Sequence, residues 1–127
     1  MYMPYCTEVK GVIMFCEGIS PSLQGILEDK IEDKLGNLQS RTAVGNATVL
    51  SFSGRREYDE SNFDEFYGEL SNYIKSAEIE FAGEDGALWK DEFKDGKWTQ
   101  REGRIAYSEQ AVELDITPYN SRYKEER

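Results

Sequence analysis

Two closely spaced turn signals constrain the fold of this chain more than any other part of its sequence. Asp95-Gly96 is a strong signal for a two-residue hairpin turn, and the segment 83–86 suits a three-residue loop with Gly86 in the left-handed conformation. With these loop lengths, both hairpins place aromatic residues on the same face of a three-stranded meander, and this agreement predicts that the face is buried. The cross-strand pairs are Phe81 with Trp89 and Phe93 with Trp98.

Two amphipathic helices are predicted to cover that face. Ser20-Pro21 is a typical helix start, because serine caps the helix and proline suits its first position, and Glu28 belongs to the charged side of this helix. A second helix begins at Asp59 or Ser61 and runs to about Lys75. Each helix carries an apolar stripe at helical spacing. The first stripe is Leu23, Ile26, Leu27, Ile31 and Leu35, and the second is Phe63, Phe66, Tyr67, Leu70, Tyr73 and Ile74.

The remaining strands are predicted from the alternation of apolar and polar residues. Residues 5–16 form a strand with apolar side chains on both faces, which suggests a central position in the sheet. Residues 47–53 and 77–82 form two more strands, and the second of these turns alternate glutamates toward water. Residues 37–46 are polar with little pattern, so we predict a loop there.

Together these elements predict an α+β fold with a mainly antiparallel sheet of five or six strands. The predicted order is β-α-β-α-β-β-β, with both amphipathic helices packed on one face of the sheet. A last edge strand is predicted from the alternation of Val112, Leu114 and Ile116. We expect residues 1–117 to form a single domain and residues 118–127 to form a polar tail.

The chain lacks the residue types on which most enzyme sites depend. It has no histidine, which removes the commonest general base and metal ligand, and it has no glycine-rich phosphate-binding loop. Cys6 and Cys16 lie about 33 Å apart on an extended strand, too far for a disulfide. We therefore predict a non-enzymatic protein with no catalytic residue, no metal site and no cofactor. Reduced thiols, with no signal peptide or apolar membrane span visible, predict a cytoplasmic location.

The negative charge is concentrated in one third of the sequence. The net charge is −10, and residues 57–95 hold 13 acids and three bases, so the rest of the chain is neutral overall. A protein this acidic repels nucleic acid and anionic membranes and attracts basic proteins. We predict one acidic face that binds a basic protein partner, with a purely solubilising surface as the alternative. The predicted partner-binding residues are Tyr58 as an exposed anchor, Asp59, Glu60, Asp64, Glu65, Glu69, Glu78, Glu80, Glu84 and Asp85.

Two resemblances bear on function. Residues 81–98 resemble a hairpin motif of small bacterial and phage proteins, which implies a fold element and no activity. In size, acidity and lack of catalytic residues the chain is similar in kind to phage inhibitors of bacterial defence, including anti-CRISPR proteins, and to the immunity proteins of nuclease toxins. This likeness implies an inhibitor that occupies a basic, nucleic-acid-binding cleft of a partner protein. A small-ligand-binding or regulatory domain, or a homo-oligomeric structural protein, is the alternative.

Overall fold

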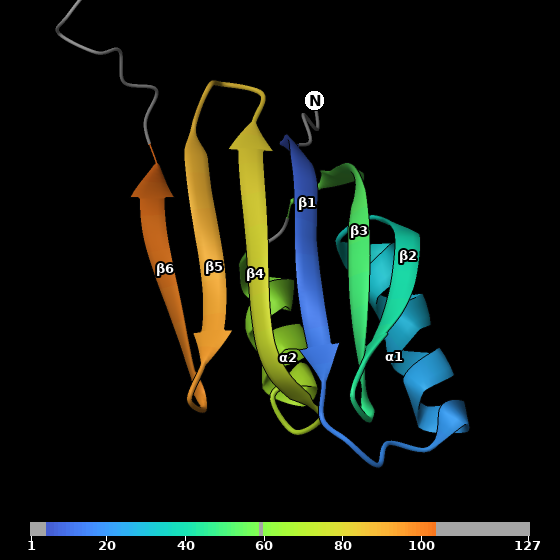
Figure 1. Cartoon of the computed structure of the whole chain (residues 1–127). Helices are drawn as coiled ribbons and strands as arrows, with labels where there is room; N and C mark the ends of the chain where they lie inside the picture. Colours follow the sequence, from blue (N-terminus) through green and yellow to red (C-terminus); the bar gives the residue numbers. More distant parts are fainter. Residues whose placement is uncertain (1–4, 59, 104–127) are drawn as a thin grey trace, which may run out of the picture.

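The described part of the protein forms one antiparallel sheet with two helices against a single face of it (Figure 1). The computed structural model describes residues 5–58 and 60–103, and of residues 60–62 it describes the backbone only. In chain order the elements are β1 (Cys6–Phe15), α1 (Pro21–Lys34), β2 (Asn37–Val44), β3 (Ala47–Glu57), α2 (Glu60–Leu70), β4 (Ile74–Gly83), β5 (Leu88–Lys94) and β6 (Lys97–Gly103). The predicted α+β class and the placement of two helices on one face are confirmed.

The strands lie in the order β2-β3-β1-β4-β5-β6, and every neighbouring pair is antiparallel. The first six elements therefore have the β-α-β-β-α-β connectivity of the split β-α-β, or ferredoxin-like, motif. β5 and β6 extend the sheet beyond β4 as a meander. Connectivity of this kind serves many unrelated functions, so function has to be argued from the side chains.

Both predicted hairpins are confirmed in their turns and in their registers. Gly86 has a φ of 90°, in the left-handed region that favours glycine. The two residues of the Asp95-Gly96 turn have φ values of 53° and 78°, as a type I′ turn requires. The aromatic pairs are Phe81–Trp89 and Phe93–Trp98, on the side of the sheet that the helices cover.

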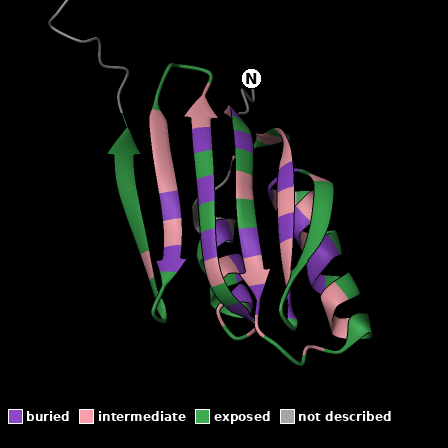
Figure 2. Cartoon of the chain, viewed as in Figure 1, coloured by how far each residue is buried: buried purple, intermediate pink, exposed green. Residues whose placement is uncertain are grey.

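Residues 37–46 are not the predicted loop, because most of them form β2 at one edge of the sheet. An edge strand open to water needs few apolar residues, and Leu38 alone in β2 is half-buried while the rest of the strand is exposed (Figure 2). The turn into β3 is Gly45-Asn46, a two-residue hairpin signal, and Gly45 has a φ of 63°. The element order is therefore β-α-β-β-α-β-β-β, which corrects the predicted order by one strand.

Two further boundaries differ from the prediction. β3 continues to Glu57, beyond its predicted end at residue 53. α2 ends at Leu70 instead of near Lys75: the Tyr73 amide donates to the Leu70 carbonyl at 2.8 Å, which closes a turn. Ile74 then begins β4 and is buried there, so its apolar side chain serves the strand and not the helix.

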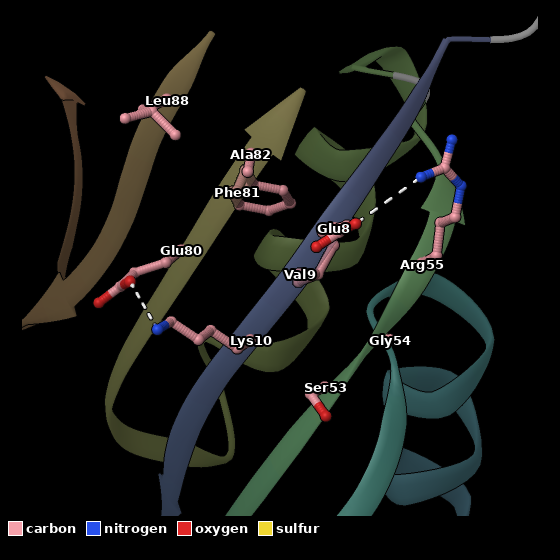
Figure 3. Close-up of a pocket in the computed structure, with 10 residues that line it drawn as sticks. All are labelled: Glu8, Val9, Lys10, Ser53, Gly54, Arg55, Glu80, Phe81, Ala82 and Leu88. Carbon is pink, nitrogen blue, oxygen red and sulfur yellow. Dashed lines mark ion pairs between the residues drawn. The ribbon is translucent and has the colours of Figure 1, made fainter. Parts of the chain in front are cut away.

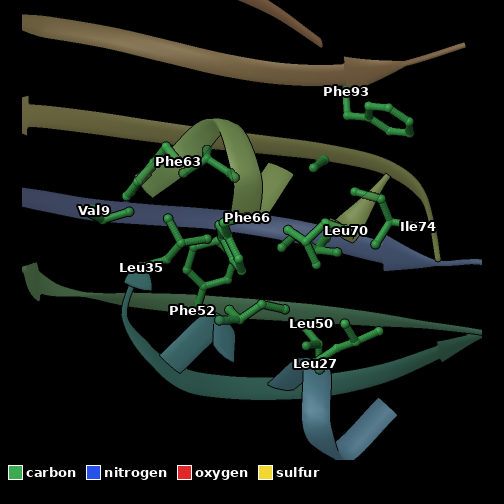
Figure 4. Packing of buried hydrophobic residues seen from close by; sticks show 14 of the residues in the cluster. Val9, Leu27, Leu35, Leu50, Phe52, Phe63, Phe66, Leu70, Ile74 and Phe93 are labelled. Atoms are coloured by element: carbon green, nitrogen blue, oxygen red, sulfur yellow. The ribbon is translucent and has the colours of Figure 1, made fainter. Parts of the chain in front are cut away.

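The hydrophobic core lies between the helices and the sheet (Figure 4). The helices contribute Leu27, Ile31 and Leu35 from α1 and Phe63, Phe66 and Leu70 from α2. The central strands contribute Val9, Ile13, Phe15, Leu50, Phe52, Ala77, Ile79 and Phe81. Gly11 of β1 allows close packing at the centre, because a Cβ there would lie 2.9 Å from the Phe52 ring and 2.5 Å from the Glu78 carbonyl oxygen.

The outer side of α1 departs from the predicted pattern in two positions. The spacing predicts Ile26 in the apolar stripe, but this residue is 53% exposed. Glu28, expected on the charged side, is only 6% exposed because Arg41 of β2 covers it, with Nη2 2.6 Å from Oε1 and Nε 2.9 Å from Oε2. Hydrogen bonds from Arg41 lower the pKa of Glu28, so this acid stays ionised and ties α1 to the edge strand.

Some predicted features lie outside the described residues. These are the strand at Val112, Leu114 and Ile116, the tail at residues 118–127 and the domain limit between them, which stay predictions. In the part of the chain that is described, neither helix has the length and apolar character needed to cross a membrane. Cys6 and Cys16 are both free, at opposite ends of β1.

Candidate functional site

The ten predicted partner-binding residues do not form one acidic face. The side chains of α2 and the exposed glutamates of β4 lie on opposite sides of the sheet, so no single surface contains both, and the prediction of one face is wrong. Asp59 and the side chain of Glu60 lie outside the described part of the structure. The other seven predicted acids fall into three groups: Asp64, Glu65 and Glu69 on α2; Glu78 and Glu80 on β4; Glu84 and Asp85 in the β4–β5 turn.

The open side of the sheet, away from the helices, is nearly neutral. Cross-strand neighbours point the same way, so the strand registers assign five acids and six bases to this side. Ion pairs link them: Lys10 lies 3.7 Å from Glu80, and Lys90 lies 3.7 Å from Glu78. The charged residues of the open side are Glu8, Glu57, Glu78, Glu80, Glu92, Lys10, Arg55, Lys90, Lys94, Lys97 and Arg101.

The two acids of the β4–β5 turn also have partners. Glu84 lies 3.8 Å from Arg55, and Asp85 accepts a hydrogen bond of 2.6 Å from the Tyr5 hydroxyl. That hydrogen bond raises the pKa of Tyr5 to about 12 and lowers the pKa of Asp85. The turn is thus tied to the start of β1, which gives these carboxylates a structural role.

A hollow of about 550 Å³ opens on the neutral side of the sheet (Figure 3). Arg55 and Glu8, 3.8 Å apart, and Lys10 with Glu80 stand on its walls, while Leu88 adds an apolar side chain. Charges of both signs around an open cavity suit a small ligand that itself carries both signs.

The helix layer, by contrast, is strongly acidic. α1 contains four acids and two lysines and α2 contains four acids and no base, so the two helices hold −6 of the net charge of −10. Lys30 of α1 bridges to Glu69 of α2 at 2.6 Å. Asp64 and Glu65 are exposed on α2, and no ion pair between described residues includes either of them.

A second cavity lies on the helix side, between α2 and the β5–β6 hairpin, and we call it the α2–β6 pocket. Its volume is about 280 Å³. Aromatic side chains line it from both elements, Tyr67 from α2 and Trp98 from the hairpin, and α2 also contributes the carboxylate of Asp64. Its lining residues are Tyr58, Phe63, Asp64, Tyr67, Asp91, Trp98, Thr99 and Gln100.

Asp91 is the buried acid of the α2–β6 pocket. It is 4% exposed, because the strand alternation of β5 turns it toward the helices beside two aromatic neighbours. The Tyr67 hydroxyl donates to its Oδ2 at 2.6 Å, and Gln100 Nε2 donates to its Oδ1 at 2.8 Å. Burial, together with the negative charge of Asp91, raises the pKa of Tyr67 well above its usual value, so Tyr67 remains a hydrogen-bond donor.

Stacked rings hold the aromatic wall of the pocket in place. The Trp98 and Tyr67 rings lie 3.9 Å apart between centroids and only 5° from parallel. Trp98 Nε1 donates to Ser71 Oγ at 2.8 Å, and the Ser71 hydroxyl donates to the Tyr67 carbonyl at 2.7 Å. The end of α2 and the edge strand β6 are therefore locked together around the pocket.

Tyr58 is not the exposed anchor that the sequence predicted. It is half-buried at the end of β3, and its ring lies 4.9 Å from Phe63, 5.2 Å from Trp89 and 5.6 Å from Phe81 between centroids. Tyr58 therefore belongs to an aromatic cluster that supports the α2–β6 pocket, although it also lines that pocket.

Asp91 is a residue that the predicted partner-binding set lacks, although the sequence holds a signal for it. It lies two residues from both Trp89 and Phe93, so its side chain points to the same face of the strand as theirs. The alternation therefore places a charged residue on the face predicted to be buried. Glu92 points to the opposite side, so these two acids cannot bind one metal ion. Among residues 5–58 and 60–103, no group of three or more potential metal ligands occurs.

The acidic helix layer and the α2–β6 pocket lie on the same side of the molecule, because α2 contributes to both. Asp64 lies at the junction: it is exposed on α2 and lines the pocket. This side combines uncompensated negative charge with aromatic surface, which is suited to the recognition of a cationic group. Comparisons of the chain with protein-family models, with curated proteins and with solved structures found no match.

Proposed function

We propose that this protein is a non-enzymatic inhibitor that binds a basic partner protein through its helix layer, in a cleft where the partner holds nucleic acid. The observation that carries the proposal is the difference between the two sides of the sheet. The helices have a net charge of −6, whereas acids and bases nearly balance on the open side. Solubility is served by charges of both signs interspersed over a surface, and an excess of negative charge on one side favours a binding role.

Simple electrostatics supports this kind of partner. Carboxylates along α2 present negative charge as phosphates do, so they attract lysine and arginine clusters and accelerate the encounter. Asp64 and Glu65 have no ion pair among the described residues, so their charge is available to a partner. Nucleic acid is itself repelled by this surface, and competition for the same basic cleft is the expected mode of inhibition.

The test compares charge reversal on the two sides of the molecule. Asp64→Lys with Glu65→Lys reverses charge on the helix layer, and Glu78→Lys with Glu80→Lys makes the same change in net charge on the open side. Partners captured from a lysate of the native cells at low and high salt are purified and titrated by calorimetry with each protein. We expect the helix-layer variant to lose affinity by about tenfold or more, and the sheet variant to bind as wild type does.

Two results would overturn the proposal. The first is loss of affinity in the sheet variant with no loss in the helix-layer variant, which would move the interface to the open side. The second is the absence of competition when a short nucleic-acid duplex is added to the complex of wild-type protein and partner. Thermal denaturation of both variants establishes that they fold, so that lost binding is not lost structure.

A second candidate function, the binding of a small ligand by a regulatory domain, is favoured by the hollow on the open side. Its volume of about 550 Å³ falls within the range of ligand pockets, and its walls carry charges of both signs. A zwitterionic ligand such as an amino acid fits this chemistry. The measurement is a thermal-shift screen of amino acids at millimolar concentration: we expect a rise in Tm of about 2 °C or more, abolished by Arg55→Ala. No stabilisation by any of them would exclude this candidate.

A further inference from the structure

We propose that the α2–β6 pocket binds the guanidinium group of an arginine side chain that projects from the basic partner. This inference rests on the proposed function, and it adds the residue type that the partner inserts and the place that receives it. Three features of the pocket carry the inference: a buried carboxylate with no cationic partner among the described residues, a wall of stacked aromatic rings, and an exposed carboxylate at the rim.

The buried carboxylate is incompletely satisfied. Asp91 is 4% exposed and receives hydrogen bonds from two neutral donors, Tyr67 and Gln100. No ion pair among the described residues includes Asp91. A carboxylate has about four acceptor positions, so two donors leave roughly half of its capacity free. Since a buried negative charge is stable when it is both hydrogen-bonded and paired, a cation that enters the pocket supplies the missing interaction.

The aromatic wall selects the kind of cation. Trp98 and Tyr67 are stacked on each other and fixed by hydrogen bonds, and both line the same cavity as Asp91. Tryptophan and tyrosine attract cations through their ring faces, and a planar guanidinium stacks on such a ring while donating hydrogen bonds in its own plane. Arginine therefore satisfies the ring wall and the carboxylate together, and the compact lysine ammonium does not stack.

The rim and the size of the pocket agree with a protein side chain as the occupant. Asp64 lines the pocket and is exposed on α2, so negative charge continues from the cavity onto the acidic helix. The cavity volume of about 280 Å³ lies just below the range of roughly 300–1,000 Å³ that is usual for ligand pockets. A single side chain guided inward by the rim carboxylate fits these dimensions better than a drug-sized molecule.

The first experiment uses a blocked amino acid as the probe, so the partner need not be known. N-acetyl-arginine methylamide, its lysine counterpart and its neutral citrulline counterpart are titrated into nitrogen-15-labelled full-length protein. The Trp98 Nε1–H and the Gln100 side-chain amide are the reporters, because both groups belong to residues that line the pocket. We expect both signals to shift when the arginine probe is added and to stay in place with the citrulline probe. The lysine probe should bind with a dissociation constant about fivefold higher than that of the arginine probe.

Matched variants test the role of the buried acid. Asp91→Asn removes its charge with little change in shape, and Glu92→Gln makes the corresponding change at the next residue, which faces the open side of the sheet outside the hollow there. We expect Asp91→Asn to weaken arginine binding by roughly thirtyfold or more, and Glu92→Gln to leave it unchanged. If Asp91→Asn does not fold, the exposed rim variant Asp64→Asn takes its place, with an expected loss of about threefold, and the citrulline comparison uses wild-type protein alone.

The outcomes separate this inference from the proposed function. Suppose that Asp91→Asn binds the arginine probe and the captured partner as wild type does, while reversal of Asp64 and Glu65 still abolishes partner binding; the pocket inference then fails and the proposed function stands. Suppose instead that arginine binding depends on Asp91, but neither Asp91→Asn nor the reversal of Asp64 and Glu65 alters partner binding. The pocket is then an arginine site and the proposed function fails. Citrulline binding as tight as arginine binding would also overturn the pocket inference.

Discussion

At the residue scale, the hydrogen bond between Tyr67 and Asp91 joins the helix layer to the β5–β6 hairpin. It is 2.6 Å long and connects the half-buried residue Tyr67 to the buried residue Asp91. Hydrogen bonds to ionised groups are stronger than those between neutral groups. The same contact therefore stabilises the fold, keeps Asp91 facing the pocket and maintains Tyr67 in its protonated form.

The Tyr67→Phe variant isolates this contact, because it removes the hydroxyl and keeps the ring that stacks on Trp98. At neutral pH we expect a loss of about 1–3 kcal/mol in the free energy of unfolding. The pKa of Tyr67 is raised in the folded state, so its stabilising contribution is complete below its unfolded pKa of about 10 and declines as the pH rises above that value. Urea denaturation should show the difference in the free energy of unfolding between wild type and Tyr67→Phe narrowing as the pH rises above about 10.

A matched control for this measurement is Tyr73→Phe. Tyr73 also packs against the core, but the hydrogen bonds between described residues include none to its hydroxyl. Its stability curve should run parallel to that of wild type over the same pH range. The stability loss of a variant is its difference from wild type in the free energy of unfolding. A loss for Tyr67→Phe that is constant with pH, or as small as the loss for Tyr73→Phe, would show that the bond to Asp91 contributes nothing.

At the scale of elements, the sequence predicts those parts whose own residues determine their structure. The β4–β5–β6 meander is predicted correctly because Gly86 and Asp95-Gly96 define the turns and alternate aromatics define the buried face. β2 could not be recognised in the same way, because its pairing with β3 uses backbone groups and its side chains are exposed. The end of α2 is ambiguous for another reason: Ile74 fits the helical spacing of α2 as well as the first position of β4.

The residues of the candidate site also differ in how far the local sequence predicts them. Asp64 is among the predicted partner-binding residues, because the spacing of apolar residues in α2 predicts which side of the helix is exposed. The importance of Asp91 depends on α2 packing against β5 and β6, which are distant in sequence, and on the donors Tyr67 and Gln100 that this packing provides. Local periodicity carries no information on which helix covers which strand, so the pocket emerges only from the fold.

Glycine substitutions test the packing of the central strand. Gly11→Ala should lower the free energy of unfolding by about 1–3 kcal/mol, because the added Cβ would lie 2.5 Å from the Glu78 carbonyl oxygen and 2.9 Å from the Phe52 ring. Gly25→Ala is the matched change in α1, where nothing lies within 4 Å of the added Cβ. There we expect stabilisation of roughly 0.5–1 kcal/mol, since alanine is the better helix former. Chemical denaturation of both variants provides the comparison, and equal effects would contradict the packing described for Gly11.

At the scale of the whole molecule, the sheet separates two electrostatic environments. One side carries acids and bases linked by ion pairs such as Lys10–Glu80 and Arg101–Glu92, and the other carries the acidic helices. The acidic stretch 57–95 contributes to both sides, because a strand and a helix that are neighbours in sequence place their exposed residues on opposite surfaces. Net charge per segment therefore does not reveal where charge accumulates in the folded protein.

The placement of the helices on one side of a nearly neutral sheet gives the described part of the molecule an electric dipole moment directed across the sheet. In the field of a positively charged body, such a dipole experiences a torque that turns the helices forward before any atoms touch. Toward a basic partner of the kind proposed above, the protein would therefore approach already oriented, and a larger share of random collisions would begin in a productive geometry.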